Sequence, residues 1–411
     1  MSTAITLVLA LLFAASTAPA AEEENFGVRG VGRLVGEVGP PRRVEIVFID
    51  GVRLEAEEVW LDREDLQWRR THSSRRESQA LARVAGLRWI APVAAANPSG
   101  PMLMLRNGER FPGRPDRGEG SLRWIHPWLG AIEIDLESMQ ALDLAGRGAS
   151  TAEASAADRS DGDRVRLQNG DLLEGLVLEL TTDCVVEGPD GNERVVPLEL
   201  VDRIDLLATA APPGRIRVRA FDGTVLDATS VSLAEGSESA MLSIRGAGAR
   251  GDGAVASETT LLLRELESIA LAPDRSIALA AIEPRSGAMP DSPRPWIPPP
   301  AIDRDRLPDL GIADLEISGP ARIAWRVPKG AVLSTVASLP DSMRRFGDFT
   351  MTLRDGDRVL LQHHFDQDSP RIPIAVVIAT GELILELEQG RHGAVQDRLH
   401  LASPLLITPR P

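Results

Sequence analysis

Four carboxylates near the C-terminal end of the chain have a spacing that could bind a cation. Asp355 and Asp357 are followed by Asp366 and Asp368, and hard cations such as calcium take several carboxylate oxygens. The glycine between Asp355 and Asp357 is equally typical of a tight turn, which explains that pair without a metal. A structural calcium ion is therefore an open alternative without support, and we expect no other cofactor.

The side chains of His363, His364 and Cys184 are the remaining candidates for metal or nucleophilic chemistry. Adjacent residues of a strand point to opposite faces, so His363 and His364 cannot share one ion. Cys184 is the only cysteine, which excludes an intramolecular disulfide. Its apolar neighbours Val185 and Val186 indicate a small buried side chain rather than a nucleophile.

The chain contains none of the common motifs for catalysis. There is no G-x-S-x-G elbow, no H-E-x-x-H helix, and no glycine-rich phosphate loop between a strand and a helix. A carboxylate pair for glycoside hydrolysis cannot be placed, because its defining separation is spatial. We therefore expect a protein that is not an enzyme.

Residues 1–20 have the composition of a secretory signal peptide. They carry no charged side chain, and the apolar run from Ile5 to Ala15 is too short to cross a bilayer. Ala18 and Ala20 provide the small residues of a cleavage site. An uncleaved anchor is the alternative, because no Lys or Arg precedes the apolar run. We expect export to the periplasm, the cell surface or the medium, with no integral membrane segment after cleavage.

Net charge and length restrict the partners and the architecture. The 411 residues include 60 Asp and Glu against 45 Lys and Arg, a formal net charge of -15. Such a balance lacks the basic surface that nucleic acids or anionic membranes require, so neither is an expected partner. The length predicts several domains.

An Asx-Gly pair recurs four times between alternating apolar positions. The pairs are Asp50-Gly51, Asn107-Gly108, Asn169-Gly170 and Asp222-Gly223. Pairs of this kind are typical of type I′ hairpin turns, in which both central residues have positive φ. Each pair therefore predicts two antiparallel strands that bury one face.

Each repeat ends with the same apolar spacing, three intervals of three, three and two residues. The four copies are Leu81, Val84, Leu87 and Trp89; Leu136, Met139, Leu142 and Leu144; Leu198, Val201, Ile204 and Leu206; and Leu263, Leu266, Ile269 and Leu271. The pattern predicts one 3₁₀ turn followed by a short strand that pairs back and closes the sheet. The third copy, residues 165–206, resembles the small SH3-like or Sm-like barrel repeats found in tandem in exported proteins of planctomycetes and similar bacteria.

These patterns predict an all-β chain of tandem small barrels followed by a β-sandwich. The expected segments are a signal peptide at 1–20, barrels at 27–90, 101–144, 163–207 and 214–271, a flexible linker at 145–162, a Pro-rich linker at 272–308, and a sandwich at 309–411. The linkers have too few apolar residues to order themselves. We expect the barrels to fold as separate units.

The C-terminal hundred residues predict a jelly-roll sandwich without the closing pattern of the repeats. The expected strands are 314–318, 321–326, 349–354, 358–364, 372–379 and 382–388. Two hairpins are predicted, one at Asp355-Gly356-Asp357 and the other at Thr380-Gly381.

Three stretches of this module resemble the NPCBM/NEW2 family of carbohydrate-binding modules, which have a galactose-binding jelly-roll fold. They are Trp325 to Ala331, Leu353 to Leu360, and Asp397 to Ile407. The resemblance implies a glycan ligand. The module departs from the family's usual composition because it has no Tyr.

Glycan binding uses an exposed aromatic ring with polar groups beside it. The candidate ligand-binding residues are Trp325 on a strand and the loop-side residues Arg371, His392, Asp397 and Arg398. The alternatives are a core position for Trp325 and a solvated surface for the other four. Trp124 and Trp128 are a further candidate pair of exposed aromatic residues, because Pro127 between them implies a bend.

The sequence therefore favours an exported, non-catalytic binding protein. In the leading hypothesis the sandwich binds a glycan and the barrels serve as spacers and interaction modules. In the alternative the chain is a structural or protein-interaction component of the cell envelope without a sugar site.

Overall fold

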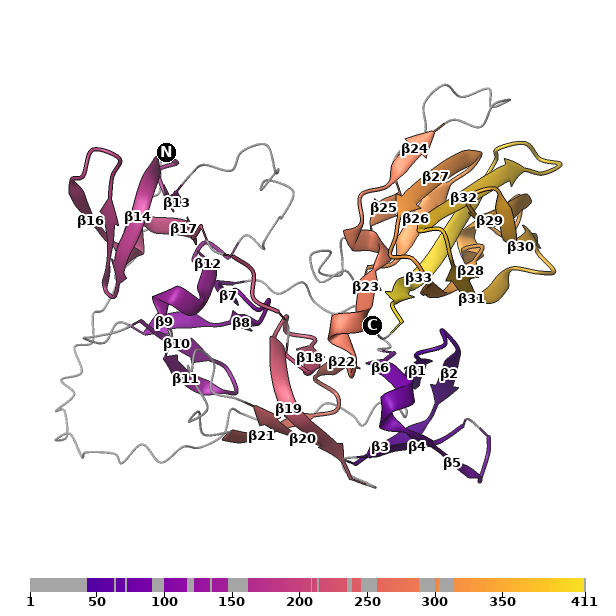
Figure 1. The fold of residues 1–411 in the computed structure, drawn as a ribbon, viewed down its shortest axis with the longest axis horizontal. Helices are drawn as coiled ribbons and strands as arrows, with labels where there is room; N and C mark the ends of the chain where they lie inside the picture. The colour runs from indigo at the N-terminus through magenta and orange to yellow at the C-terminus, as the bar shows by residue number, and fades with distance from the viewer. Residues whose placement is uncertain are drawn as a thin grey trace, which may run out of the picture. The chain divides into compact units, whose positions relative to one another are not determined.

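The fold is entirely β, with short 3₁₀ turns as its only helical elements among the described residues (Figure 1). The computed structural model describes residues 43–62, 64–70, 72–90, 100–116, 122–133, 135–146, 162–207, 209–212, 214–234, 239–244, 257–287, 300–302 and 313–409. The predicted signal peptide, most of the 145–162 linker and Trp296 lie outside these ranges. No helix in them is long and apolar enough to cross a membrane.

Four repeats of short strands occupy the chain from residue 44 to residue 270. The first contains β1 (Val44–Phe48), β2 (Arg53–Ala56), β3 (Glu58–Leu61), β4 (Asp65–Arg69), β5 (Arg76–Ala80) and β6 (Val84–Trp89). The second contains β7 (Met102–Leu105), β8 (Arg110–Pro112), β9 (Arg114–Asp116), β10 (Arg123–His126), β11 (Gly130–Glu133) and β12 (Met139–Asp143). The third contains β13 (Asp163–Leu167), β14 (Leu172–Leu180), β15 (Asp183–Glu187), β16 (Glu193–Pro197) and β17 (Val201–Asp205). The fourth contains β18 (Ile216–Ala220), β19 (Val225–Leu233), β20 (Ser239–Ile244), β21 (Ser257–Leu262) and β22 (Leu266–Ala270).

All four Asx-Gly pairs form hairpin corners, but the turn type differs from the prediction. At the first corner the N–H of Gly51 donates to the carbonyl of Phe48 at 2.9 Å, and the N–H of Phe48 donates to the carbonyl of Val52 at 2.9 Å. Gly51 has a φ of 84°, whereas Asp50 does not have positive φ. This pattern is a three-residue loop, a type I turn followed by a glycine bulge. The type I′ prediction was therefore wrong.

The Asx side chain explains why this residue precedes the glycine. The carboxylate of Asp50 accepts from the N–H of Val52 at 3.1 Å. The same bond joins Asn107 to Glu109, Asn169 to Asp171 and Asp222 to Thr224. The side chain thus binds the first N–H of the returning strand, an arrangement that Asn and Asp form readily.

The closing pattern produces the predicted structure. One-turn 3₁₀ helices, η1 (Leu81–Arg83), η2 (Leu136–Ser138) and η5 (Leu198–Leu200), precede the last strands of the first three repeats, and a hydrogen-bonded turn takes their place in the fourth. Each last strand pairs antiparallel with the first strand of its own repeat. The equivalent partners are Ile46 and Leu87, Leu103 and Leu142, Val165 and Ile204, and Val218 and Ile269.

The closing strands also pair between repeats, which the sequence did not indicate. β6 of the first repeat pairs with β22 of the fourth, and β12 of the second pairs with β17 of the third. The buried side chains of the four repeats form one connected apolar cluster. The described residues therefore do not have the separate cores that we expected. The domain boundaries and the SH3-like or Sm-like assignment of each repeat stay predictions.

The C-terminal part is a sandwich of two antiparallel sheets. One sheet has the order β25 (Ala301–Ile302), β26 (Leu315–Ser318), β33 (Arg398–Ile407), β28 (Ala331–Ser338) and β31 (Arg371–Ile378). The other has the order β24 (Arg285–Gly287), β27 (Ala321–Arg326), β32 (Glu382–Gln389), β29 (Phe349–Asp355) and β30 (Arg358–Phe365). Their facing side chains form a second core with Trp325, Phe349 and Phe365 at its centre. The six predicted strands are all present, with bounds within a residue or two.

Two local predictions in this region were wrong. β23 (Ser276–Ala278) and β24 pair with sandwich strands, and Leu279 is buried in the sandwich core, so the first part of the predicted 272–308 linker belongs to the sandwich. Thr380-Gly381 does not form a hairpin, because β31 and β32 lie in different sheets. It is instead a crossing between the sheets.

Cys184 and most of the described tryptophans are core residues. Cys184 is fully buried, as predicted, and burial raises the pKa of its thiol to about 12. Trp124 is also fully buried, so its predicted exposure was wrong. Trp128 is half-buried, and its indole N–H donates to Asp222 at 3.0 Å.

Candidate functional site

Trp325 is not available to a ligand. Its side chain is 1% exposed and belongs to the sandwich core. The residue alternates with outward-facing neighbours along β27, whose burial follows a strict period of two. Trp325 was therefore wrongly included among the candidate binding residues, and its ring fills space between the sheets.

Arg371 and Arg398 lie on the sheet that contains β31 and β33, and both are exposed. Arg371 lies 3.7 Å from the carboxylate of Glu55, in the first repeat. Arg398 donates to Glu316 on the neighbouring strand at 2.5 Å. Each guanidinium has a carboxylate partner within the chain, and neither lies against an aromatic ring among the described residues.

His392 and Asp397 lie in one loop, residues 390–397, between β32 and β33. His392 is exposed, whereas Asp397 is 2% exposed. Asp397 accepts from the N–H of Asp348 at 3.3 Å, and its carbonyl accepts from Gly319 at 2.7 Å. Asp397 therefore positions loops at this end of the sandwich, and His392 is the predicted residue that faces solvent beside other candidate groups.

Asp348 is the centre of a polar network at this end, just before the start of β29. Its carboxylate lies 2.5 Å from Nε of Arg391 and 3.1 Å from Nε2 of His364. The imidazole of His364 also lies 3.2 Å from the hydroxyl of Thr350 through Nδ1. The network therefore joins the starts and ends of three strands, β29, β30 and β32, at one point of the surface.

The protonation of Asp348 reflects this position. Burial of the carboxylate opposes ionisation, but the hydrogen bond and the charge of Arg391, together with His364, lower the pKa of Asp348 below its usual value. The same hydrogen bond raises the pKa of Arg391. Asp348 is thus a carboxylate and Arg391 a guanidinium throughout the physiological range. Asp348 is only 3% exposed, whereas the side chain of Arg391 is 71% exposed.

An exposed aromatic ring lies next to this network. Phe346 is 39% exposed, and its ring lies 6.2 Å from the imidazole of His392 in an edge-on arrangement. The guanidinium of Arg345 lies 5.0 Å from the centre of the same ring. We call Phe346, Asp348, His364, Arg391 and His392 the Phe346 surface. It combines a ring, acceptors and donors on adjacent loops.

The chain approaches itself closely here, which explains two glycines. A Cβ atom on Gly390 would lie 2.1 Å from the carboxylate of Asp348, and one on Gly347 would lie 2.6 Å from Leu339. Both positions therefore require the absence of a side chain. The loops that carry Phe346 and Arg391 are held together by backbone packing as well as by charge.

Asp355 and Asp366, two of the four carboxylates with the predicted cation spacing, have structural partners. Asp355 is buried and accepts from the N–H groups of Ala379 and Thr380 at 2.8 and 2.9 Å. Asp366 accepts from the N–H groups of Asp368 and Ser369 at 2.9 and 2.8 Å. No group of three His, Cys, Asp or Glu side chains within the described ranges is placed to hold a metal ion.

Sequence reasoning missed Phe346, Asp348, His364 and Arg391 as parts of one site. Phe346 lies in a loop without periodic apolar pattern, and Asp348 is separated from Arg391 by 43 positions. The available signal was compositional. Phe346 is an aromatic residue that directly precedes a glycine and an aspartate, which are typical of a loop. The other aromatic residues of the module, Trp325, Phe349 and Phe365, lie in the predicted strands or next to one.

Comparison with known proteins gives structural likeness only. No known family and no curated protein matches the sequence. Among solved structures, the second CBM51 and INT domains of Clostridium perfringens ZmpB in complex with GlcNAc have a TM-score of 0.27 and 11% identity. That match covers 47% of this chain and 40% of the other, so the chain spans well under half of its length.

Two further similar structures are also carbohydrate-binding modules. CBM51 from Clostridium perfringens GH95, in complex with methyl-galactose, has a TM-score of 0.26 and 12% identity, over 32% of this chain and 99% of the other. The tandem CBM51 modules of a family 98 glycoside hydrolase from Streptococcus pneumoniae have a TM-score of 0.24 and 11% identity, over 75% and 88% of the two chains. At these values the comparison assigns neither a ligand nor a residue role to this chain.

Proposed function

We propose that this chain is an exported, non-catalytic protein that binds a glycan through the Phe346 surface of its C-terminal sandwich. The observation that carries the proposal is the exposed ring of Phe346 beside the network of Asp348, Arg391 and His364. The four repeats present and space this module. Export rests on the composition of residues 1–20.

The chemistry of a sugar fits the groups on this surface. A pyranose has an apolar face that packs on an aromatic ring and a rim of hydroxyls that both donate and accept hydrogen bonds. Arg391 supplies exposed donors and His364 an imidazole that donates or accepts according to its tautomer. The buried carboxylate of Asp348 contacts both Arg391 and His364 and restricts their side chains, so little side-chain freedom is lost when a ligand binds.

A glycan array probed with the full chain tests this function. We expect binding to at least one class of bacterial or plant polysaccharide, and loss of that signal in Phe346→Ala and Arg391→Ala. Val359→Ala is the matched control, because Val359 is 48% exposed at the opposite end of β30 from His364. Absence of binding to every polysaccharide, or equal binding by Phe346→Ala, would contradict the proposal.

A second candidate function is protein interaction through the third repeat. Apolar side chains are unusually exposed there, with Leu172 49%, Leu176 55% and Val195 64% exposed. Leu176 lies on β14 and Val195 on β16, and both strands pair with β15 in one small sheet. Exposed apolar side chains on one sheet are typical of contact surfaces.

Affinity capture from an envelope extract separates the two functions. A stoichiometric protein partner that is lost in Leu176→Ser and Val195→Ser, and that no sugar displaces, would favour the interaction role. Retention of the same partner by both variants would exclude this surface. The glycan array measures the other function independently, because its variants lie in a different part of the chain.

A further inference from the structure

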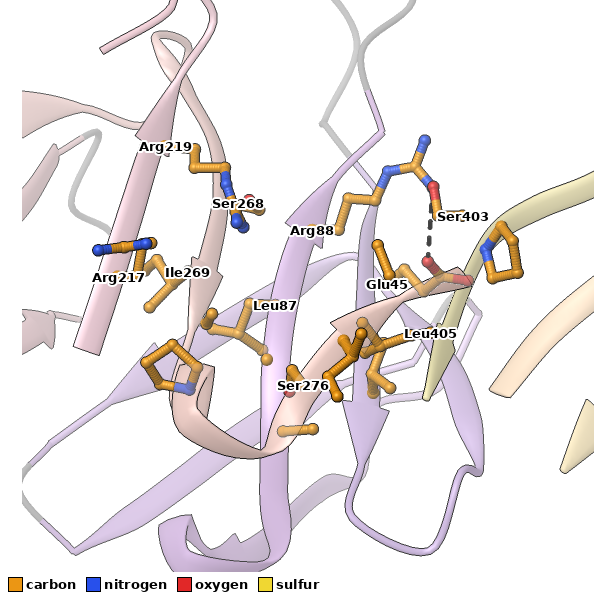
Figure 2. Close-up of a pocket in the computed structure, with 18 of the residues that line it drawn as sticks. Glu45, Leu87, Arg88, Arg217, Arg219, Ser268, Ile269, Ser276, Ser403 and Leu405 are labelled. Atoms are coloured by element: carbon orange, nitrogen blue, oxygen red, sulfur yellow. Dashed lines mark hydrogen bonds and ion pairs between the residues drawn. The ribbon is translucent and has the colours of Figure 1, made fainter. Parts of the chain in front are cut away.

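A pocket of about 320 Å³ lies where the first repeat, the fourth repeat and the sandwich meet (Figure 2). Its lining comes from β1 and β6, from β18 and β22, and from the segments around β23 and the end of β33. The volume is at the lower end of the range typical of small-molecule sites. It is separate from the Phe346 surface, which shares no residue with it.

The floor of the pocket is one continuous face of four strands. β18 pairs with β22, β22 with β6, and β6 with β1. The pairing places Arg219 opposite Ser268, Ser268 opposite Arg88, and Arg88 opposite Glu45. Since partners in antiparallel strands project from the same face, these four side chains form one polar row. The floor exists only because the closing strands of two repeats pair with each other.

The next row on the same face is small or apolar except at one end. Residues two positions along each strand point the same way, and here they are Ala270, Gly86 and Val47, with Arg217 at the β18 end of the row. A Cβ atom on Gly86 would lie 2.7 Å from the carbonyl oxygen of Ile269, so this position stays without a side chain. The other side of the pocket is formed by Ile277 and Leu405, which belong to the paired strands β23 and β33.

Three of the four arginines that line the pocket already have partners. Arg53 donates to Glu45 and to the carbonyls of Ser334 and Ser403, the last at 2.7 Å. Arg88 donates to the hydroxyl of Ser403. In the fourth repeat, the guanidinium of Arg217 pairs with Asp227 at 2.9 Å. These contacts hold the walls of the pocket together.

Arg219 and Ser268 differ from the other polar residues of the pocket. Nε of Arg219 is buried and has no hydrogen-bond partner among the described residues. The hydroxyl of Ser268 is also buried without a partner there, and the residue is only 7% exposed. The two are direct strand partners, and Figure 2 shows them side by side on the pocket wall. Two adjacent unpaired donors therefore face one cavity.

Leaving these groups unpaired has a free-energy cost that an anion would remove. A buried donor without a partner destabilises the folded chain, and the cost is larger when the donor is charged. Burial lowers the pKa of Arg219 to about 10, while the charge of Glu267 raises it, so the guanidinium stays protonated at neutral pH. Among the described residues that line the pocket there are four arginines and one carboxylate, Glu45, so the lining has a net positive charge.

We propose that this pocket binds a small organic carboxylate, with its carboxylate group on Arg219 and Ser268 and its apolar body against Val47, Ala270 and Leu405. A planar carboxylate matches the fork of a guanidinium and also accepts from a serine hydroxyl. The apolar side chains of Val47, Ala270 and Leu405 require that the anion carry an apolar part. The ligand joins the two halves of the four-stranded floor at the point where the repeats meet.

Titration calorimetry of the full chain with benzoate as the probe tests the site. We expect saturable binding to the wild type, and at least a tenfold weaker affinity in Arg219→Gln, because the variant loses the charge-assisted hydrogen bonds to the carboxylate. Ser268→Ala should weaken binding to a smaller extent. Arg194→Gln is the matched control, since Arg194 is an exposed arginine of the third repeat with Asp190 as its partner.

A second variant fills the pocket without changing its charge. Ala270→Leu should abolish benzoate binding while circular dichroism and the unfolding midpoint show a folded chain. Inorganic phosphate should bind more weakly than benzoate, because it has no apolar part. No benzoate binding at millimolar concentration, unchanged affinity in Arg219→Gln, or phosphate binding as tight as benzoate binding would each overturn the proposal. None of these results bears on the glycan array, which reports on the Phe346 surface.

Discussion

Nε2 of His126 lies 2.9 Å from the hydroxyl oxygen of Thr224, which joins the second repeat to the Asx-Gly corner of the fourth. Nδ1 of His126 accepts from the N–H groups of Trp128 and Leu129 at 3.3 and 3.1 Å. An imidazole that accepts at Nδ1 carries its single proton on Nε2, so the bond to Thr224 is a donation from a neutral ring. Protonation of Nδ1 would break both backbone bonds.

The first prediction is that acid destabilises the chain through His126. Burial lowers the pKa of His126 to about 4 from an ordinary value of 6.5, and the charge of Asp222 offsets only part of this. The unfolded state therefore binds this proton first, so the stabilisation is complete above pH 6.5 and is lost as the pH falls toward about 4. Denaturant unfolding across this window should show a loss of about 3 kcal/mol in the free energy of unfolding from this residue.

His126→Gln should flatten the pH dependence of the free energy of unfolding, whereas replacement of the exposed His392 in His392→Gln should leave it unchanged. An equal slope in His126→Gln would contradict this assignment.

A second prediction concerns the glycine of the third Asx-Gly corner. Gly170 has a φ of 93°, and no other residue lies within 4 Å of the position of an added Cβ. Gly170→Ala should therefore lower the free energy of unfolding by about 1–2 kcal/mol through backbone conformation alone. Gly170→Asn should cost less, because Asn tolerates the left-handed region. Equal stability of the alanine variant and the wild type in urea unfolding would refute the corner geometry.

A third prediction uses Cys184 as a probe of the third repeat. The thiol is fully buried, and its pKa is raised to about 12 by burial and by the nearby charge of Asp163. A disulfide reagent such as DTNB should therefore react very slowly at pH 8 and quickly once denaturant unfolds the repeat. Rapid modification of the native chain would show that the repeat opens or that the thiol is accessible.

The fourth prediction concerns Asp348 as the residue that holds the loops of the Phe346 surface. Asp348→Asn removes the ion pair with Arg391 and the carboxylate that contacts Nε2 of His364. Amide hydrogen exchange in residues 390–397 should become faster, as measured by mass spectrometry of peptides from that loop. Asp357→Asn, in the exposed hairpin at the other end of β29, is the matched control. Unchanged exchange in Asp348→Asn would mean that backbone packing alone orders the loop.

Local patterns predicted the strands of this chain well because they report local physics. The Asx-Gly pairs marked all four corners, and the closing pattern marked the turn and last strand of every repeat. The turn type was wrong because the type I turn with a glycine bulge uses the same residue pair as type I′. The choice between them depends on the register of the flanking strands, which the pair itself does not specify.

Contacts between distant segments were not predictable from these patterns. The pairing of β6 with β22 joins residues such as Leu87 and Ile269, whose apolar character is equally consistent with a separate core for each repeat. Ser268 likewise has no local feature that marks it as a pocket residue. Both the pocket and the merged core depend on pairing between the edge strands of different repeats. Such pairing leaves no periodic pattern in the sequence.

The residues of the candidate site were predicted least well where they lie in loops. Trp325 attracted attention as an aromatic residue, although its alternation along β27 already favoured the core. Phe346 lies in a connection, where the absence of periodicity leaves burial undetermined. The candidate surface forms around it only because Asp348 and Arg391 meet across two loops.

The most direct test of the proposed function is titration calorimetry of the full chain and its Phe346→Ala variant against an oligosaccharide from the polysaccharide that binds most strongly on the array. The structure predicts about a fivefold or greater loss of affinity in the variant, because packing of a sugar face on an aromatic ring contributes about 1 kcal/mol. The loss should occur with an unchanged unfolding midpoint, since the ring of Phe346 lies outside the buried core of the sandwich. Identical affinities of the wild type and Phe346→Ala would contradict the assignment of this surface as the glycan site.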